Sequence, residues 1–137
     1  SIKVIENELQ RTEDPESESV YEKVNKKVQI YEIDGPFFFG IANKFDELAA
    51  ETTTRKPQVR IVRMRKVPFI DSTGLKNLRS LCDKSRKEKI QIILSGVTDE
   101  VYQVLDRSGF ADELGKEFIF DHISKALDKA NELTANK

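Results

Sequence analysis

A carboxylate, two hydroxyls and a glycine stand together at Asp71-Ser72-Thr73-Gly74, between an apolar, strand-like stretch and a helical one. Asp71 can accept hydrogen bonds from the free amides of the helix that follows. Gly74 permits a tight turn or a close approach of the backbone. Ser72 would lie at the carboxyl end of a sheet strand, where ligands and partners of α/β sheets gather. The segment is therefore either a plain helix start or a surface that meets a ligand or partner.

A second group of residues that could bind ligands is basic. Residues 55–66 contain six Lys or Arg and no acid, and the helical stretch after Gly74 adds further basic residues. These side chains are either solvated faces and strand ends or a patch for an anion, a nucleotide, acidic lipid headgroups or an acidic protein. Nucleic acid is disfavoured because no recognition motif accompanies the charge. Residues 98–137 are acidic by contrast, with nine Asp or Glu against five Lys or Arg.

Residue types suited to catalysis or metal binding are sparse. His122 is the single histidine and Cys82 the single cysteine, so neither a His/Cys metal site nor an internal disulfide is supported. Cys82 shares an apolar stripe with Leu75, Leu78 and Leu81, which predicts a core position. No Ser/His/Asp order, carboxylate pair or phosphate-cradling glycine loop is present. We therefore expect no enzymatic activity, no metal and no cofactor.

The size and composition of the chain predict one domain. It has 137 residues, 38% of them apolar and 34% charged, with a formal net charge of -1. The single cysteine suits a reducing compartment. No apolar run approaches the roughly 20 residues that a membrane span needs. The chain begins with Ser1 rather than Met, and we interpret it as an excised part of a longer protein.

Strand-like and helix-like stretches alternate from Val28 onward. β-branched and apolar residues predict strands at 28–33, 37–39, 59–67, 90–94 and 118–120. Apolar residues at helical spacing predict helices over 41–51, from 71–74 to about 88, over 98–109, and after Asp121, which we expect to cap the last helix. This order predicts an α/β fold, with a mixed, largely parallel central sheet of roughly four to six strands and about four helices packed against it.

Two segments resemble one known family. The segment from Pro68 to Leu75, which reads P-F-I-D-S-T-G-L, resembles the D-S-[ST]-G signature of STAS domains. These domains include anti-sigma factor antagonists and the C-terminal domains of SulP anion transporters. The segment from Ile33 to Gly40, which reads I-D-G-P-F-F-F-G, is similar to the I-x-G-P-F-F-F-G segment of bacterial SulP members. Together with the element order, these segments extend the resemblance over about residues 20–135.

The resemblance implies a STAS (anti-sigma factor antagonist) fold and a function. It implies the cytoplasmic C-terminal regulatory and interaction domain of a SulP family sulfate (inorganic anion) transmembrane transporter, on the cytoplasmic side of the inner (plasma) membrane. The acidic stretch near the start suggests a partly disordered linker from the membrane domain over 1–20, with the STAS domain over 21–135. Expected partners are the transporter membrane domain, a second copy, acyl carrier protein or a nucleotide. The alternative is a free-standing anti-sigma factor antagonist regulated by phosphorylation of Ser72.

The resemblance also implies roles for individual residues. In anti-sigma factor antagonists the serine directly after the aspartate is phosphorylated, and the phosphate abolishes partner binding; that serine is Ser72 here, followed by Thr73. A phosphate would add about -1.5 to -2 charge beside Asp71. Asp71 and Gly74 are expected to cap the helix. The charge of the basic cluster and the apolar run at 37–39, rather than the resemblance, indicate the residues that we expect to contact a partner or an anion: Phe38, Arg63, Arg65, Lys66 and Lys76.

Overall fold

A computed structural model describes residues 2–5, 26–34 and 56–135 of the chain. The predicted strand at 37–39, the predicted helix over 41–51 and the candidate contact Phe38 lie outside these residues. Most of the predicted linker, residues 6–20, also lies outside them.

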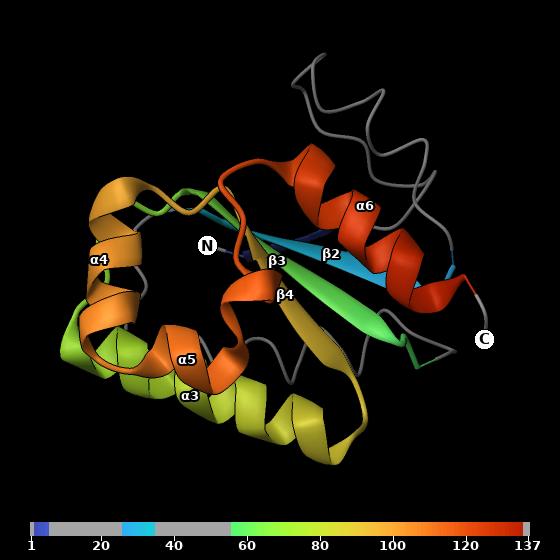
Figure 1. Cartoon of the computed structure of the whole chain (residues 1–137), viewed down its shortest axis with the longest axis horizontal. Coiled ribbons are helices and arrows are strands. Elements are labelled where there is room, and N and C mark those ends of the chain that lie inside the picture. Colours follow the sequence, from blue (N-terminus) through green and yellow to red (C-terminus); the bar gives the residue numbers. More distant parts are fainter. Residues whose placement is uncertain (1, 6–25, 35–55, 136–137) are drawn as a thin grey trace.

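A four-stranded sheet forms the centre of the described part (Figure 1). Its strands lie in the order β1 (Ile2–Ile5), β2 (Val28–Asp34), β3 (Val59–Lys66) and β4 (Gln91–Ser95). β2, β3 and β4 are parallel, and β1 is antiparallel to β2. This confirms the predicted mixed, largely parallel sheet.

β1 lies within the stretch that the sequence predicts to be a linker, residues 1–20. Residues Ile2–Ile5 pair with β2, from Ile2 opposite Ile33 to Ile5 opposite Ile30. Three of these four residues are β-branched, which suits an edge strand. A run of four residues is too short to be distinguished from an irregular terminus by its pattern alone. Residues 2–5 therefore pair with the sheet, and a linker over residues 1–20 stays a prediction.

Helices cover both faces of this sheet (Figure 1). α3 (Ser72–Lys87), α4 (Asp99–Arg107) and α5 (Phe110–Leu114) pack on one face, and α6 (Ile123–Thr134) packs on the other. Alternate strand residues point to opposite faces, so each strand contributes side chains to two hydrophobic cores, one on either side of the sheet. Tyr31, Val62 and Leu94 belong to the α3 side, whereas Ile30, Ile61 and Ile93 belong to the α6 side.

The region between α4 and α6 departs from the sequence prediction. α4 ends at Arg107, and a second short helix, α5, follows Gly109, whose φ is +85°. In place of the strand predicted at 118–120, the chain forms a 3-10 helix, Lys116–Phe118, and a single parallel bridge from Ile119 to Leu94. Such a short apolar run does not distinguish a strand from other packed backbone.

The cap of α6 is His122 rather than Asp121. The His122 Nδ1 accepts a hydrogen bond from the Ser124 backbone N–H at 3.1 Å. Asp121 instead accepts a hydrogen bond from Lys125 Nζ at 2.9 Å. Aspartate is the commoner cap residue, which is why the sequence favoured it. The helix begins one residue later than that preference indicates.

Candidate functional site

The Asp71–Gly74 segment starts α3, directly after the loop that leaves β3 at the carboxyl end of the parallel strands. Asp71 is the N-cap, and its Oδ1 accepts a hydrogen bond from the Gly74 backbone N–H at 2.7 Å. Gly74 is buried, whereas Ser72 and Thr73 are exposed in the first turn. The segment therefore combines a structural cap with two hydroxyls that a partner or an enzyme can reach.

Replacing Asp71 with alanine is expected to destabilise the domain by about 1 kcal/mol, because α3 loses the acceptor for one of its free amides. Asp71→Asn should retain most of the stability, since its amide oxygen can still accept from Gly74. Urea unfolding of both variants measures the difference. Equal losses in the two variants would show that the carboxylate charge matters more than the cap geometry.

An exposed aromatic residue lies close to the cap in the chain. Phe69 is 50% exposed, and it is the one large hydrophobic side chain that the described residues leave exposed. Its neighbours Pro68, Ser72 and Thr73 are also exposed. Exposed aromatic rings often anchor protein interfaces. Phe69 is not among the contacts predicted from the sequence, although it stands within the P-F-I-D-S-T-G-L segment.

The predicted basic contacts separate into two groups. Arg63 is only 5% exposed, so it is not part of an exposed patch. Arg65 is partly buried, and its Nε donates to Glu32 Oε1 at 2.7 Å. Lys66 and Lys76 are exposed, so these two can meet an anionic partner. The acid-free run in the sequence is therefore not one continuous surface patch.

The register between β2 and β3 explains where these arginines point. Arg60 lies opposite Gln29, and Arg63 lies opposite Glu32. The Arg60 Nη2 donates to Gln29 Oε1 at 3.4 Å, and its guanidinium stacks 5.0 Å from the centre of the Tyr31 ring. The sequence does contain a signal for this arrangement, because each strand has two polar residues that are three positions apart. The signal can be recognised only when the register between β2 and β3 is known.

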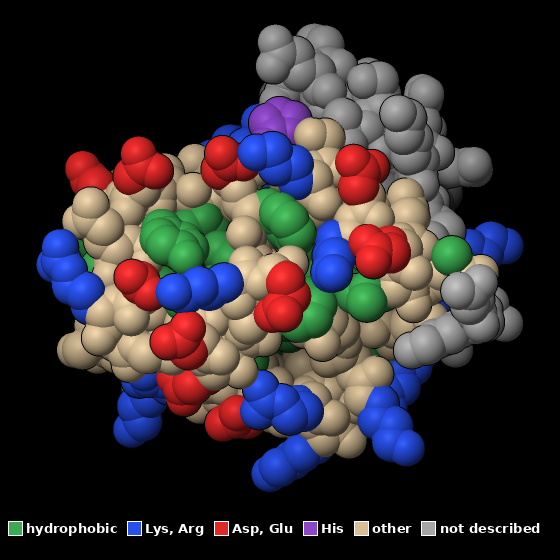
Figure 2. All heavy atoms as spheres, in the orientation of Figure 1, with side chains coloured by type: hydrophobic (Ala, Val, Ile, Leu, Met, Phe, Trp, Pro, Cys, Tyr) green, Lys and Arg blue, Asp and Glu red, His purple; other side chains and the backbone are tan. Residues whose placement is uncertain are grey.

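Positive and negative charges are mixed on the face that Figure 2 displays. Figure 2 shows Lys and Arg side chains interspersed with Asp and Glu over the face it displays, with hydrophobic side chains visible between them. Charged residues of the C-terminal part pair locally, such as Lys125 with Asp121 at 2.9 Å and Lys116 with Asp106 at 3.4 Å. Local pairing weakens the long-range field that the acidic composition of residues 98–137 suggested.

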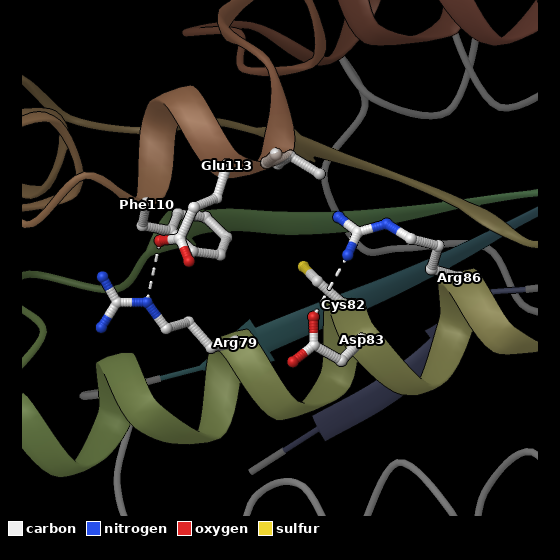
Figure 3. A pocket seen from close by; sticks show the side chains of 7 residues that line it. Arg79, Cys82, Asp83, Arg86, Phe110 and Glu113 are labelled. Carbon is white, nitrogen blue, oxygen red and sulfur yellow. Dashed lines mark hydrogen bonds and ion pairs between the residues drawn. The ribbon is translucent and has the colours of Figure 1, made fainter.

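A groove runs between α3 and α5 (Figure 3). Its main cavity has a volume of about 390 Å³, and an adjoining cavity of about 220 Å³ shares four of its lining residues, Cys82, Arg86, Glu113 and Leu114. Arg79 closes one end by donating to Glu113 Oε2 at 3.0 Å and to the Ser108 carbonyl at 2.7 Å. We call this feature the α3–α5 groove. The sequence did not predict it, because α5 was not expected.

Cys82 lies in this groove, and burial raises the pKa of its thiol from the ordinary value of 9.0 to about 12, while Arg86 opposes that rise. The folded protein therefore keeps the thiol proton at pH values where the unfolded chain loses it. The free energy of unfolding should fall as the pH rises from 9.0 towards about 12, by an amount that Cys82→Ala lacks. Urea unfolding of both proteins across this pH range tests it; parallel pH curves would contradict the assignment.

The described ranges contain neither a candidate metal site nor a helix that could span a membrane. Nowhere in 2–5, 26–34 and 56–135 do three His, Cys, Asp or Glu side chains gather in a way that could hold a metal ion. None of the helices in those ranges is long and apolar enough to cross a membrane.

The sequence pattern of the STAS domain family matches residues 20–130, which is most of the chain. The chain belongs to the STAS domain family. A sulfate transporter family protein from Wolinella succinogenes has a similar structure, with a TM-score of 0.75 and 43% sequence identity, over 82% of this chain and 92% of that one. The SulP transporter STAS domain from Vibrio cholerae has a TM-score of 0.73 and 29% identity, over 82% and 88% of the two chains. These matches confirm the predicted SulP branch.

Two curated relatives, both transporters by name, are much longer than this STAS domain. The putative sulfate transporter YvdB of Bacillus subtilis is 26% identical over 95 residues, which are 69% of this chain but 18% of the relative. Sulfate transporter 1.3 of Arabidopsis thaliana is 31% identical over 88 residues, which are 63% of this chain and 13% of the relative. The chain thus spans less than a fifth of the length of these transporters.

Proposed function

We propose that this STAS domain is the cytoplasmic regulatory and interaction part of a SulP family sulfate transporter, and that it acts by binding rather than by catalysis. The observation that carries the proposal is the 43% identity to the sulfate transporter family protein of Wolinella succinogenes, over nearly the whole of that chain. The curated relatives named above are also sulfate transporters. The transported anion would pass through a membrane domain outside this sequence.

The surface at the start of α3 is the proposed contact with the membrane domain. Phe69 supplies an exposed ring, and Ser72 and Thr73 supply exposed hydroxyls. Lys66 and Lys76, which are both exposed, add positive charge to the flanks. Ser72 is the position at which we propose a phosphate would act, because a doubly charged group beside Asp71 would repel an acidic partner surface. Binding of a second copy, of acyl carrier protein or of a nucleotide stays a prediction.

The test is uptake of labelled sulfate by cells that carry the full-length parent transporter. Deleting this domain, or replacing Phe69 with serine, should lower uptake while the membrane domain remains inserted at normal abundance. Lys129→Gln, on the far helix α6, serves as the control and should leave uptake unchanged. Full uptake after deletion of the domain would contradict a regulatory role. A parent gene with no apolar spans before Ser1 would contradict the transporter assignment itself.

The alternative of a free-standing anti-sigma factor antagonist is supported less well. An anti-sigma factor antagonist from Thermotoga maritima has a TM-score of 0.65 but only 17% identity, a likeness that shows the fold alone. The alternative predicts that the isolated chain binds an anti-sigma factor and that Ser72→Glu abolishes this binding. A pull-down with both forms of the chain separates this alternative from the transporter function.

A further inference from the structure

The α3–α5 groove is separate from the surface that the proposed function uses. That surface lies at the first turn of α3, whereas the groove is lined by its later turns, from Arg79 to Arg86. The main cavity, of about 390 Å³, falls within the size range of small-molecule sites. Figure 3 shows that the side chains of both helices converge on this space.

The floor of the groove is apolar and is contributed by several elements. Cys82 belongs to α3, Phe110 and Leu114 belong to α5, and Ile92 belongs to β4. All four are at most 8% exposed, so their positions are held by the core around them. A packed apolar floor beneath an open mouth suits the hydrocarbon part of a ligand.

The two arginines of the groove differ in how firmly they are held. Arg79 bridges α3 to Glu113 and to the Ser108 carbonyl, so its donors serve the structure and its charge offsets that of Glu113. The Arg86 side chain makes one hydrogen bond among the described residues, to Asp83 Oδ1 at 3.2 Å on its own helix, and both side chains are more than 60% exposed. Such an exposed ion pair is weak, so Arg86 can exchange Asp83 for the carboxylate of a ligand.

Arg86 is therefore the cation that a ligand can recruit. It lines both the main and the adjoining cavity. A guanidinium presents paired N–H donors that match a carboxylate or sulfate group. The neighbouring floor is uncharged at neutral pH, because the buried Cys82 thiol keeps its proton.

We propose that the α3–α5 groove binds a small, free amphipathic anion, with its apolar tail over Cys82, Phe110 and Leu114 and its carboxylate or sulfate head on Arg86. Asp83 would release Arg86 when the ligand head arrives. The proposal concerns a second site on the domain, distinct from the docking surface at the start of α3. It does not depend on the transporter assignment.

Octanoate is the probe, and acetate and octanol are its matched controls, since the first lacks the tail and the second lacks the charge. Amide chemical shifts of the labelled 137-residue chain follow each titration. Octanoate should shift the amides of α3 and α5 and should slow the alkylation of Cys82 by N-ethylmaleimide. Acetate should produce no saturable shift, and octanol should bind about tenfold more weakly than octanoate.

Variants separate the head-group site from the floor. Arg86→Gln should weaken octanoate about tenfold and leave octanol unchanged, because only the charged head uses the guanidinium. Arg107→Gln, an exposed arginine of α4 that does not line the groove, is the matched control and should change nothing. Leu114→Trp should block both ligands by filling the floor. Arg86→Gln lies at an exposed position, so it should fold even if Leu114→Trp does not.

Three outcomes would overturn the proposal. One is the absence of octanoate-induced shifts in α3 and α5, a second is equal binding of octanoate by the Arg86→Gln variant and the unaltered chain, and a third is an octanoate site elsewhere on the domain. Because binding is measured on the chain alone, each of these results leaves the sulfate-uptake test of the proposed function untouched.

Discussion

Replacing Gly96 with alanine is expected to destabilise the domain by about 3–4 kcal/mol, the sum of a strained backbone and a steric clash. Gly96 follows β4 and has a φ of +67°. A Cβ atom on this residue would lie 2.7 Å from the backbone nitrogen of Arg65, and both the Cβ and Cα of Arg65 would be within 2.9 Å. The end of β3 would have to move, and the loop leading to Asp71 begins there.

Gly109 provides the matched control for this prediction. Its φ is +85°, so alanine there suffers the same kind of backbone strain, but no atom lies within 4 Å of an added Cβ. Gly109→Ala should therefore cost only about 1–2 kcal/mol. Urea unfolding of the two variants separates the strain from the clash. If both variants lost the same free energy of unfolding, the close approach of Gly96 to Arg65 would not contribute to the cost of the substitution.

Replacing Arg65 with methionine is expected to destabilise the domain by about 2–4 kcal/mol, because it leaves a buried carboxylate without its 2.7 Å partner. The Glu32 side chain is only 4% exposed, whereas that of Arg65 is 28% exposed. The cost should therefore be asymmetric. Glu32→Gln should cost less, about 1 kcal/mol, since the amide still accepts a hydrogen bond and Arg65 can turn towards water.

The exposed pair of Arg86 and Asp83 is the reference for this measurement. Both of its side chains are more than 60% exposed, so Arg86→Met should change stability by no more than about 0.5 kcal/mol. A double-mutant cycle with Arg65→Met and Glu32→Gln then gives the coupling energy of the buried pair. A coupling energy as small as that of an exposed pair would contradict a structural role for Arg65.

Several features of this domain could be predicted from neighbours in the chain. The α/β order follows from runs of β-branched residues such as 90–94 and from the apolar stripe of Leu75, Leu78 and Leu81. The cap at Asp71 follows from its position before that stripe. Each of these signals spans a single element, so it survives without knowledge of the rest of the fold.

The burial of arginines within the basic run at residues 55–66 could not be predicted from the sequence. Its composition suggested a charged surface, but Arg60 and Arg63 are buried because β3 is a central strand flanked by polar residues of β2 in register. The sequence alone does not distinguish an exposed arginine from a buried one. Only strand pairing decides whether a carboxylate or amide from another part of the chain is close enough to accept their hydrogen bonds.

The sequence by itself thus determined the STAS family, the order of β3, α3, β4 and α4, and the helix cap at the start of α3, since these rest on local pattern and on two short motifs. The tertiary structure alone decided that Phe69 is exposed, that Arg65 is held by Glu32, and that a groove lies between α3 and α5. The physical reason is that exposure, ion pairing and cavities depend on contacts between segments about thirty residues apart in sequence, and a linear pattern does not record the distances between them.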